Sequence, residues 1–181
     1  MNPPNVISLA RLLCVPATVW LVLSGRIEAA FWLFLGAGAS DAVDGFLAKR
    51  FNWKTPLGGF LDPMADKALL VCVFVLLGAK GMLPDWLVAL VVLRDVLILG
   101  GAAIIMRSGS FTHIRPLWVS KVNTLLQILL AAYVLAEHGF HLADGSITNI
   151  LVTAVTFSTL VSGFAYLVKW GRRAAGYEGA A

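Results

Sequence analysis

Long apolar runs alternate with short polar connections along the whole chain of 181 residues. Each run is close to the ~20 residues that an α-helix needs to cross a lipid bilayer. Residues that favour turns, such as glycine, proline and serine, gather in the connections between the runs. We therefore predict an all-α integral membrane protein that forms a single domain over residues 1–181. Its six transmembrane helices are expected at residues 6–24, 28–48, 57–79, 84–106, 116–136 and 147–169.

The composition excludes an ordinary soluble domain. Hydrophobic residues make up 59% of the chain and charged residues 13%, and the mean hydropathy is +0.85. The amino-terminal segment, residues 1–5, lacks a basic region and is followed by no convincing cleavage site, so we interpret it as mature protein. The absence of a leader rich in arginine and serine favours a bacterial inner membrane over a mitochondrial import product.

The positions of lysine and arginine predict the orientation in the membrane. If the helices alternate in direction, nine of the 14 basic residues fall at the carboxyl end or in the connections before the third and fifth helices. Only Arg26 and Lys80 fall on the opposite side. Basic residues prefer the cytoplasmic side, so both termini are expected there. The net charge of +4 follows from this asymmetry and indicates anionic lipids and phosphate substrates as partners, with no nucleic acid.

Four aspartates stand in the second and third predicted helices: Asp41, Asp44, Asp62 and Asp66. Carboxylates flanked by apolar helix are energetically costly, and clustered carboxylates repel each other. Spacings of three and four residues place the two members of each pair on one face of their helix. A compensating cation is therefore expected at this cluster, and a metal site is the leading hypothesis.

The connection between these two helices is expected to bring the two acidic pairs to similar depth. The second helix should end near Arg50, and the third should begin with Thr55 as N-cap and Pro56 in the first helical position. A short connection makes the helices antiparallel neighbours, so that the pairs can face one another. An all-oxygen shell with positions left open for a substrate phosphate suits one or two Mg²⁺ or Mn²⁺ ions.

Small residues accompany the aspartates. Their size allows a bulky ligand or another backbone to come close to the helix surface. Helix packing alone explains many small residues in membrane proteins, but the place of these residues between the acidic pairs favours a ligand. The set consists of Gly45, Ala48, Gly58 and Gly59.

The spacing of eight residues in this region resembles the signature of the CDP-alcohol phosphotransferase family, whose members make phospholipids in membranes. The family fold also has six transmembrane helices and an active site open to the cytosol, so the resemblance covers essentially the whole chain. Lys49 departs from the pattern, because the family usually has arginine there; a cation is retained, but the planar two-pronged phosphate contact is lost. The residues are Asp41-x2-Asp44-Gly45-x2-Ala48-Lys49-x8-Gly58-x3-Asp62-x3-Asp66.

This resemblance implies a role for each residue of the signature. Asp41, Asp44 and Asp62 would bind metal, while Asp66 would both help to hold metal and serve as the general base. A homodimer is implied as well. The pocket for cytidine diphosphate would be lined by Gly45, Ala48, Lys49 and Gly58.

These roles predict a phosphatidyl transfer. The hydroxyl of a lipid acceptor would lose its proton to Asp66 and attack the β-phosphorus of CDP-diacylglycerol, and CMP would leave. Metal ions would neutralise the diphosphate and align the nucleophile, which are the two main needs of phosphoryl-type transfer.

Cationic residues on the same side of the membrane are candidates for binding the acceptor. Arg94 adjoins Asp95 inside the fourth predicted helix, as either a structural ion pair or an anion-binding group. Arg107, Arg115 and Lys121 cluster around the next connection, where simple topology explains basic residues equally well. Together the four cations could receive an acceptor phosphate.

Two short runs look like the cardiolipin synthase branch of the family, the CMP-forming type: Arg94-Asp95-Val96 and Ser120-Lys121-Val122-Asn123-Thr124. This similarity implies phosphatidylglycerol as the acceptor and cardiolipin as the product. Phosphatidylglycerophosphate synthase, with glycerol 3-phosphate as acceptor, shares the arginine and the Lys-x2-Thr spacing. It is therefore the nearest alternative.

The opening segment Asn5-Val-Ile-Ser8-Leu-Ala-Arg11 also resembles the start of family members. It would place Asn5, Ser8 and Arg11 along one face of the first helix near the cytosol, in reach of the nucleotide. A snorkelling arginine with helix-capping neighbours is the alternative.

A divalent-cation transporter would also require carboxylates inside the membrane. The acidic residues here are confined to one pair of helices near one face, and no duplicated pattern of broken helices is visible. An enzyme is therefore favoured over a transporter.

Overall fold

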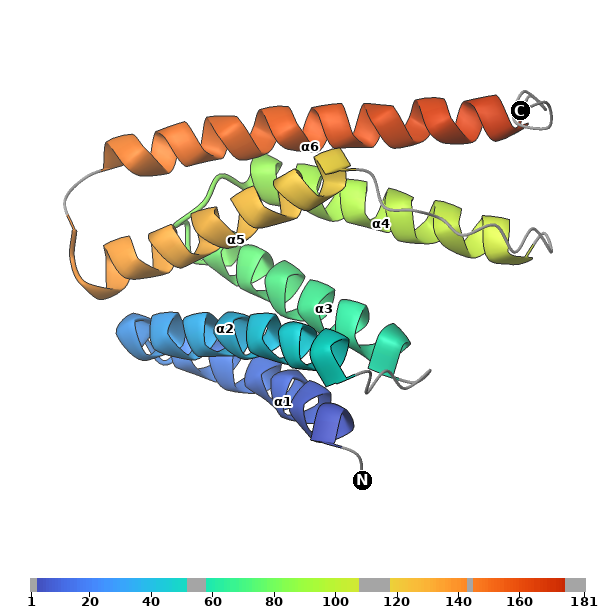
Figure 1. Cartoon of the computed structure of the whole chain (residues 1–181). Helices are drawn as coiled ribbons and strands as arrows, with labels where there is room; N and C mark the ends of the chain where they lie inside the picture. The colour runs from blue at the N-terminus through green and yellow to red at the C-terminus, as the bar shows by residue number, and fades with distance from the viewer. Residues whose placement is uncertain (1–2, 52–57, 108–117, 143–144, 175–181) are drawn as a thin grey trace. The chain divides into compact units, whose positions relative to one another are not determined.

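The computed structural model describes the chain in four segments, residues 3–51, 58–107, 118–142 and 145–174. Side chains are described for residues 13–40, 67–101, 118–142 and 145–169. Within these segments the backbone forms six α-helices, which Figure 1 shows in chain order. They are α1 (Pro3–Leu23), α2 (Ile27–Phe51), α3 (Gly58–Ala79), α4 (Asp85–Arg107), α5 (Trp118–Gly139) and α6 (Gly145–Ala174).

The helices follow the six predicted apolar runs to within five residues at every boundary. The six helices confirm the all-α prediction for the described part of the chain. A long apolar stretch forms a helix because a helix satisfies all of its backbone hydrogen bonds within the same segment. The predicted N-cap Thr55 and the first helical position Pro56 lie outside the described residues.

Two stretches in the described part of the chain are long and apolar enough to cross a membrane, Trp118–Gly139 and Gly145–Lys169. Three other described stretches are apolar but shorter, namely Leu13–Leu23, Ile27–Ser40 and Lys67–Ala79. The six membrane crossings and the cytoplasmic position of both termini stay predictions.

Helix α6 buries several hydroxyl side chains while it exposes large apolar ones. Thr159 and Ser162 are 1% and 0% exposed, whereas Phe157 and Phe164 are 71% and 69% exposed. An exposed apolar face of this kind is unfavourable in water but favourable against lipid, where helices associate through small and polar residues. The distribution of side chains on α6 therefore fits a membrane environment.

The chain packs as two compact units, each made of segments that are far apart in the sequence. The first unit combines Met1–Leu83 with Ala131–Gly145, and the second combines Pro84–Leu130 with Ser146–Ala181. Helix α5 contributes residues to both units. The single domain over residues 1–181 stays a prediction.

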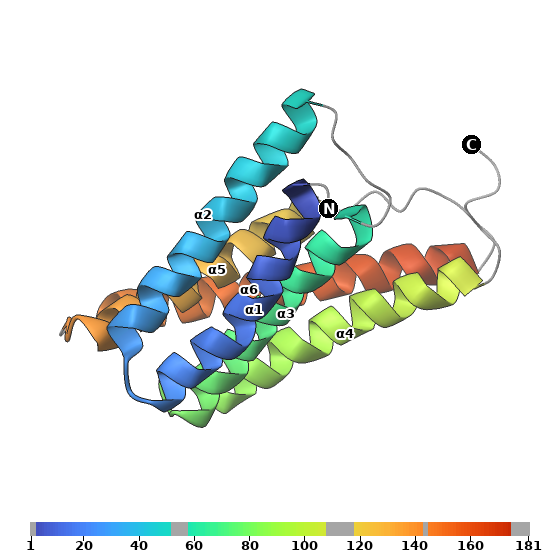
Figure 2. The same cartoon turned by 90° about the horizontal axis from the view of Figure 1, so that it is seen from below.

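Helix α1 is central to the first unit, because it packs against both α2 and α3 (Figure 2). Side chains from all three helices are buried, including Val22 of α1, Phe34 of α2 and Phe74 of α3. In a lipid bilayer such side chains stabilise the unit through van der Waals packing between the helices. The two helices that carry the four aspartates are thus held by one common neighbour.

The end of α5 makes a close backbone contact with the start of α2 inside the first unit. A Cβ atom added to Gly139 would stand 2.9 Å from both the Cα and the N of Glu28, closer than real Cβ contacts. Beside this contact, the Phe140 ring packs edge-on against Phe31, with ring centroids 5.4 Å apart. Only glycine allows the two backbones to approach this far.

Replacing Gly139 with alanine is therefore expected to lower the free energy of unfolding by about 1–3 kcal/mol, because backbone atoms of α2 must move. Thermal unfolding of the purified protein in detergent measures this as a lower Tm. Gly36→Ala is the matched control, since a Cβ there meets open space and alanine favours the helix. Equal Tm values for the two variants would contradict the proposed contact.

Candidate functional site

The four aspartates lie where the two predicted helices were expected to carry them. Asp41 and Asp44 belong to the last turns of α2, and Asp62 and Asp66 to the first turns of α3. At 1.5 Å per residue, the acidic positions of α2 are roughly 10 and 15 Å from its end, and those of α3 roughly 6 and 12 Å from its start. The side chains themselves lie outside the described set, so their meeting across the two helices stays a prediction.

The buried face of α2 leads by helical period to the first acidic pair. Ala30, Phe34 and Ala37 are buried and follow one another at spacings of four and three residues. The same spacing continued along α2 reaches position 41, four residues beyond Ala37, and then position 44. Residues at this spacing share one face of an α-helix. Positions 41 and 44 therefore continue the helical spacing of the buried residues of α2.

Helix α3 has the same relationship to the second acidic pair. Leu70, Val73 and Leu77 are buried at spacings of three and four residues. Continued backwards, the spacing reaches position 66, four residues before Leu70, and then position 62. The acidic positions of both helices thus continue the helical spacing of the buried residues nearest to them.

Most other predicted site residues lie in helices whose backbone, but not side chain, is described at those positions. Within the side chains that are described, no three of the types His, Cys, Asp and Glu come together to hold a metal ion, and the four aspartates are not among them. Arg115 lies outside the described residues. The remaining positions are Asn5, Ser8 and Arg11 in α1, Gly45, Ala48 and Lys49 in α2, Gly58 and Gly59 in α3, and Arg107 at the end of α4.

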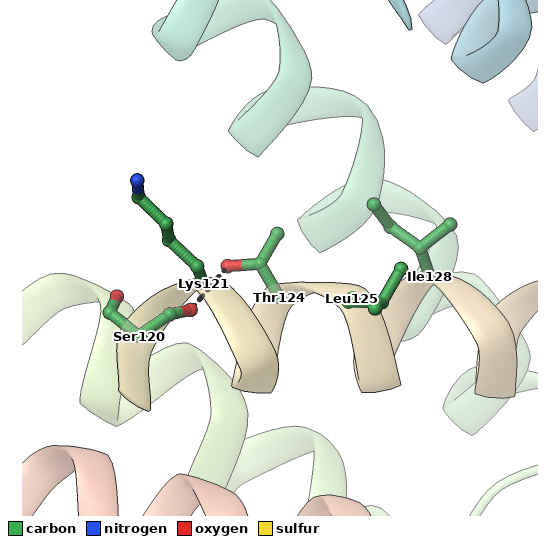
Figure 3. A pocket seen from close by; sticks show the side chains of 5 residues that line it. All are labelled: Ser120, Lys121, Thr124, Leu125 and Ile128. Atoms are coloured by element: carbon green, nitrogen blue, oxygen red, sulfur yellow. Dashed lines mark hydrogen bonds between the residues drawn. The ribbon is translucent and has the colours of Figure 1, made fainter. Parts of the chain in front are cut away.

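A groove runs along the first half of α5 in the second unit (Figure 3). One end of the groove is polar, and the other end is apolar. The hydroxyl of Thr124 donates a hydrogen bond to the carbonyl oxygen of Ser120, at 3.1 Å. The lining residues in chain order are Ser120, Lys121, Thr124, Leu125 and Ile128.

Lys121 supplies the cation of this groove. Its side chain is exposed, and its Nζ lies 4.9 Å from the centroid of the Trp118 ring. An ammonium over an indole ring is a favourable cation–π contact, of about 0.5–1 kcal/mol at an exposed site. The charge therefore stands at the polar end, beside an apolar strip made by Leu125 and Ile128.

Arg94 is buried in the second unit, where it is 3% exposed. Its Nη1 donates to the Oδ1 of Asp95 at 2.6 Å, so the structural ion pair that the sequence left as one alternative is present. Its Nη2 donates to the hydroxyls of Ser120, at 2.6 Å, and Ser162. Breaking a buried pair by removing one partner typically costs about 3–5 kcal/mol. Arg94 thus joins α4 to both α5 and α6.

A second polar contact joins α5 to α6. The Oδ1 of Asn123, which is fully buried, accepts hydrogen bonds from Ser158 at 2.7 Å and Thr159 at 2.9 Å. The side-chain amide of Gln127, one turn further along α5, is buried without a hydrogen-bond partner among the described residues. Hydrogen bonds between buried side chains fix the rotation of one helix against another.

Sequence reasoning missed the hydroxyl residues of α6 that bind Arg94 and Asn123. Their signal was present, because Ser158, Thr159 and Ser162 recur at helical spacing within an otherwise apolar run. Polar residues on one face of a transmembrane helix indicate contact with a polar residue of another helix. The pattern alone does not identify which other helix supplies the partner.

The chain is similar in sequence to a known protein family and to several individual proteins. A family model described as CDP-alcohol phosphatidyltransferase matches residues 1–165. A chloroplastic protein of Oryza sativa subsp. japonica named CDP-diacylglycerol–glycerol-3-phosphate 3-phosphatidyltransferase 1 is 34% identical, over 94% of this chain and 57% of the relative. A Rattus norvegicus protein named cardiolipin synthase (CMP-forming) is 30% identical, over 94% of this chain and 61% of the relative.

A bacterial relative matches over nearly its full length. The Bacillus subtilis protein named CDP-diacylglycerol–glycerol-3-phosphate 3-phosphatidyltransferase is 30% identical, over 93% of this chain and 94% of the relative. The chain spans less than two thirds of the length of the rice and rat relatives. The names of these relatives thus include both of the enzyme activities that the sequence left open, the glycerol-3-phosphate transferase and the CMP-forming cardiolipin synthase.

Proposed function

The chain belongs to the CDP-alcohol phosphatidyltransferase family, and on this premise we propose that it transfers the phosphatidyl group of CDP-diacylglycerol to an alcohol and releases CMP. The observation that carries the proposal is the acidic signature on α2 and α3, which lies inside the matched region. The apolar exposed faces of the helices support a membrane-associated enzyme of phospholipid biosynthesis. We further propose that its active site faces the cytoplasm. Its location in a bacterial inner membrane and its assembly as a homodimer stay predictions. Family membership also favours the enzyme over a cation transporter.

Asp41, Asp44, Asp62 and Asp66 are the residues that would hold one or two Mg²⁺ or Mn²⁺ ions. The family generally depends on a divalent metal. Four carboxylates offer the all-oxygen donor set that these hard cations prefer. Their positions continue the helical spacing of the buried residues of α2 and α3, which supports the proposal. A bound metal would supply charge neutralisation for the diphosphate and the departing CMP.

Asp66 is proposed to accept the proton of the acceptor hydroxyl. The oxygen of that hydroxyl then forms a bond to the β-phosphorus of CDP-diacylglycerol, and the bond between this phosphorus and the CMP oxygen breaks. The proton moves to the Asp66 carboxylate, and CMP carries away the negative charge of the leaving oxygen. Of the two aspartates of α3, position 66 is the nearer along the helix to the buried residues Leu69 and Leu70.

The nucleotide is proposed to lie against the small residues of the signature and the start of α1. In the first helix, Thr18 and Val22 are buried, and continuing their face backwards reaches position 11 and then position 8. Of the first-helix residues of the proposed pocket, Ser8 thus continues the helical spacing of the buried residues Thr18 and Val22. Its full set is Asn5, Ser8, Gly45, Ala48, Lys49 and Gly58.

Phosphatidylglycerol is the acceptor that we propose, with cardiolipin as the product. The groove on α5 combines the exposed ammonium of Lys121 with the apolar Leu125 and Ile128, and a phospholipid offers a phosphate and acyl chains to match. Arg107 and Arg115 are proposed to add positive charge toward the same phosphate. Glycerol 3-phosphate is the second candidate, since the rice and Bacillus relatives carry that acceptor in their names. A small polar acceptor would leave the apolar end of the groove without a role.

Purified protein given CDP-diacylglycerol and Mn²⁺ is expected to release CMP with phosphatidylglycerol about tenfold faster than with glycerol 3-phosphate. A single methylene group in a hydrophobic pocket is typically worth about 10–200-fold in rate, so contacts to the acyl chains are expected to supply at least the lower value. The lipid product is identified as cardiolipin, and a reaction without acceptor corrects for hydrolysis. CMP release with glycerol 3-phosphate, but not with phosphatidylglycerol, would reject our choice of acceptor while leaving the transfer reaction intact.

A further inference from the structure

The guanidinium of Arg94 has no two-pronged edge left for a phosphate. An arginine binds a phosphate through two parallel N–H groups, either Nη1 with Nη2 or Nε with Nη2. Both edges need a hydrogen of Nη2, and Nη2 already donates to Ser120 and to Ser162. Nη1 is bonded to Asp95, and Nε is buried without a partner among the described residues. At 3% exposure, the side chain is also closed off from a ligand that arrives from outside the second unit.

The same contacts restrain the position of the first turn of α5. Ser120 precedes Lys121 directly, so a bond from Arg94 to the Ser120 hydroxyl restrains the backbone from which the lysine projects. The bond to Ser162 ties this turn to α6 as well. A charged donor forms stronger and more directional hydrogen bonds than a neutral one. Arg94 therefore limits both the rotation of α5 and its shift along its own axis at the polar end of the groove.

We infer that Arg94 is a positioning residue that acts through Ser120. It does not contact the acceptor; it holds the first turn of α5 so that Lys121 meets the acceptor phosphate at the groove. This inference rests on the proposed function, in which Lys121 binds that phosphate. It reassigns Arg94 from a phosphate ligand to a support for one.

A double-mutant cycle between Arg94 and Lys121 tests the inference. The variants are Arg94→Lys, which keeps the positive charge beside Asp95 but loses the fork, Lys121→Met, and the two combined. Each single change is expected to raise the KM for the acceptor about tenfold, the size of one charge-assisted hydrogen bond. The KM for CDP-diacylglycerol is expected to stay within about twofold. The KM of the double variant for the acceptor should be no higher than that of Lys121→Met alone. Methionine does not bind the phosphate, so its position no longer affects the binding of the acceptor.

Two serines of α6 provide a matched pair that leaves Arg94 in place. Ser162→Ala removes a partner of Arg94 and is expected to raise the KM for the acceptor in the same way as Arg94→Lys. Ser158→Ala removes a hydroxyl one turn earlier, which donates to Asn123 instead. Asn123 keeps its hydrogen bond from Thr159, so the rotation of α5 is retained and both KM values should stay unchanged. Thermal unfolding shows whether Arg94→Lys folds. If it does not, the two serine variants still test the inference.

Three results would overturn the inference. Effects of Arg94→Lys and Lys121→Met that multiply in the double variant would make Arg94 an independent ligand of the acceptor. If Ser162→Ala and Ser158→Ala both raised the KM values for the acceptor and for CDP-diacylglycerol equally, the contacts of Arg94 would serve only the stability of the protein. Wild-type protein that releases no CMP with any acceptor would contradict the proposed function itself, and this is observed before any variant is compared.

Discussion

Replacing Asp66 with asparagine is expected to abolish phosphatidyl transfer, lowering kcat by about 10²–10⁴-fold or more. An amide of the same size cannot take a proton from the acceptor hydroxyl, and loss of a general base typically costs this factor. The change also removes one charged oxygen from the proposed metal ligands. The measurement is release of CMP from CDP-diacylglycerol by the purified variant. Nucleotide binding should partly survive, because three aspartates of the cluster remain.

The control for this variant is Asp85→Asn, the same chemical change at an exposed aspartate in the first turn of α4. Asp85 lies outside the acidic signature, so its replacement is expected to leave kcat and the affinity for CDP-diacylglycerol within about twofold of wild type, the usual range for surface changes. Near-normal turnover by Asp66→Asn would show that another group removes the proton. Complete loss of nucleotide binding would show that the main role of Asp66 is to hold the metal ion rather than to accept the proton.

Removing divalent metal is expected to have an effect of comparable size. Without a cation, the four carboxylates of the proposed site on α2 and α3 would repel both one another and the diphosphate of the substrate. Treatment with a chelator should therefore reduce CMP release to background, and an excess of Mg²⁺ or Mn²⁺ should restore it. Ca²⁺ is expected to restore far less, because its larger and more flexible shell suits phosphate chemistry poorly.

Variants of the acidic residues separate metal binding from an indirect effect of the chelator. Asp41→Asn should raise the Mn²⁺ concentration required for half-maximal rate, with the maximal rate partly recovered at high metal. Weakening one ligand of several lowers affinity before it abolishes binding. Full activity in excess chelator would refute the proposed metal dependence. An unchanged metal requirement in Asp41→Asn would remove that residue from the ligand set.

The positions of the helices were readable from the sequence because each is a continuous apolar run interrupted by turn-forming residues. The run predicted at 57–79 corresponds to α3, Gly58–Ala79, and the run at 84–106 to α4, Asp85–Arg107. The largest error is at the end of α6, which continues to Ala174 beyond a run predicted to end at 169. Polar residues at a helix end do not stop a helix whose backbone hydrogen bonds are already formed.

The acidic signature was likewise readable from the chain, since it depends on residue types at fixed spacing within two neighbouring helices. Spacings of three and four residues specify a shared helix face before any packing is known. The buried faces of α2 and α3 then lead in register to the same positions.

Other features depended on contacts between residues far apart in the chain, and these were decided only in three dimensions. Arg94 could equally have been a phosphate ligand until Ser162, 68 residues later, was found to bind its guanidinium. Nothing in the sequence distinguishes Gly139 from the other glycines of the chain, but it lies against the backbone of Glu28. The sequence by itself determined the helices and the acidic signature, because local hydrogen bonding and residue period specify them. Only the tertiary structure decided the partners of each buried polar group, since any hydroxyl of suitable depth could satisfy the same donor.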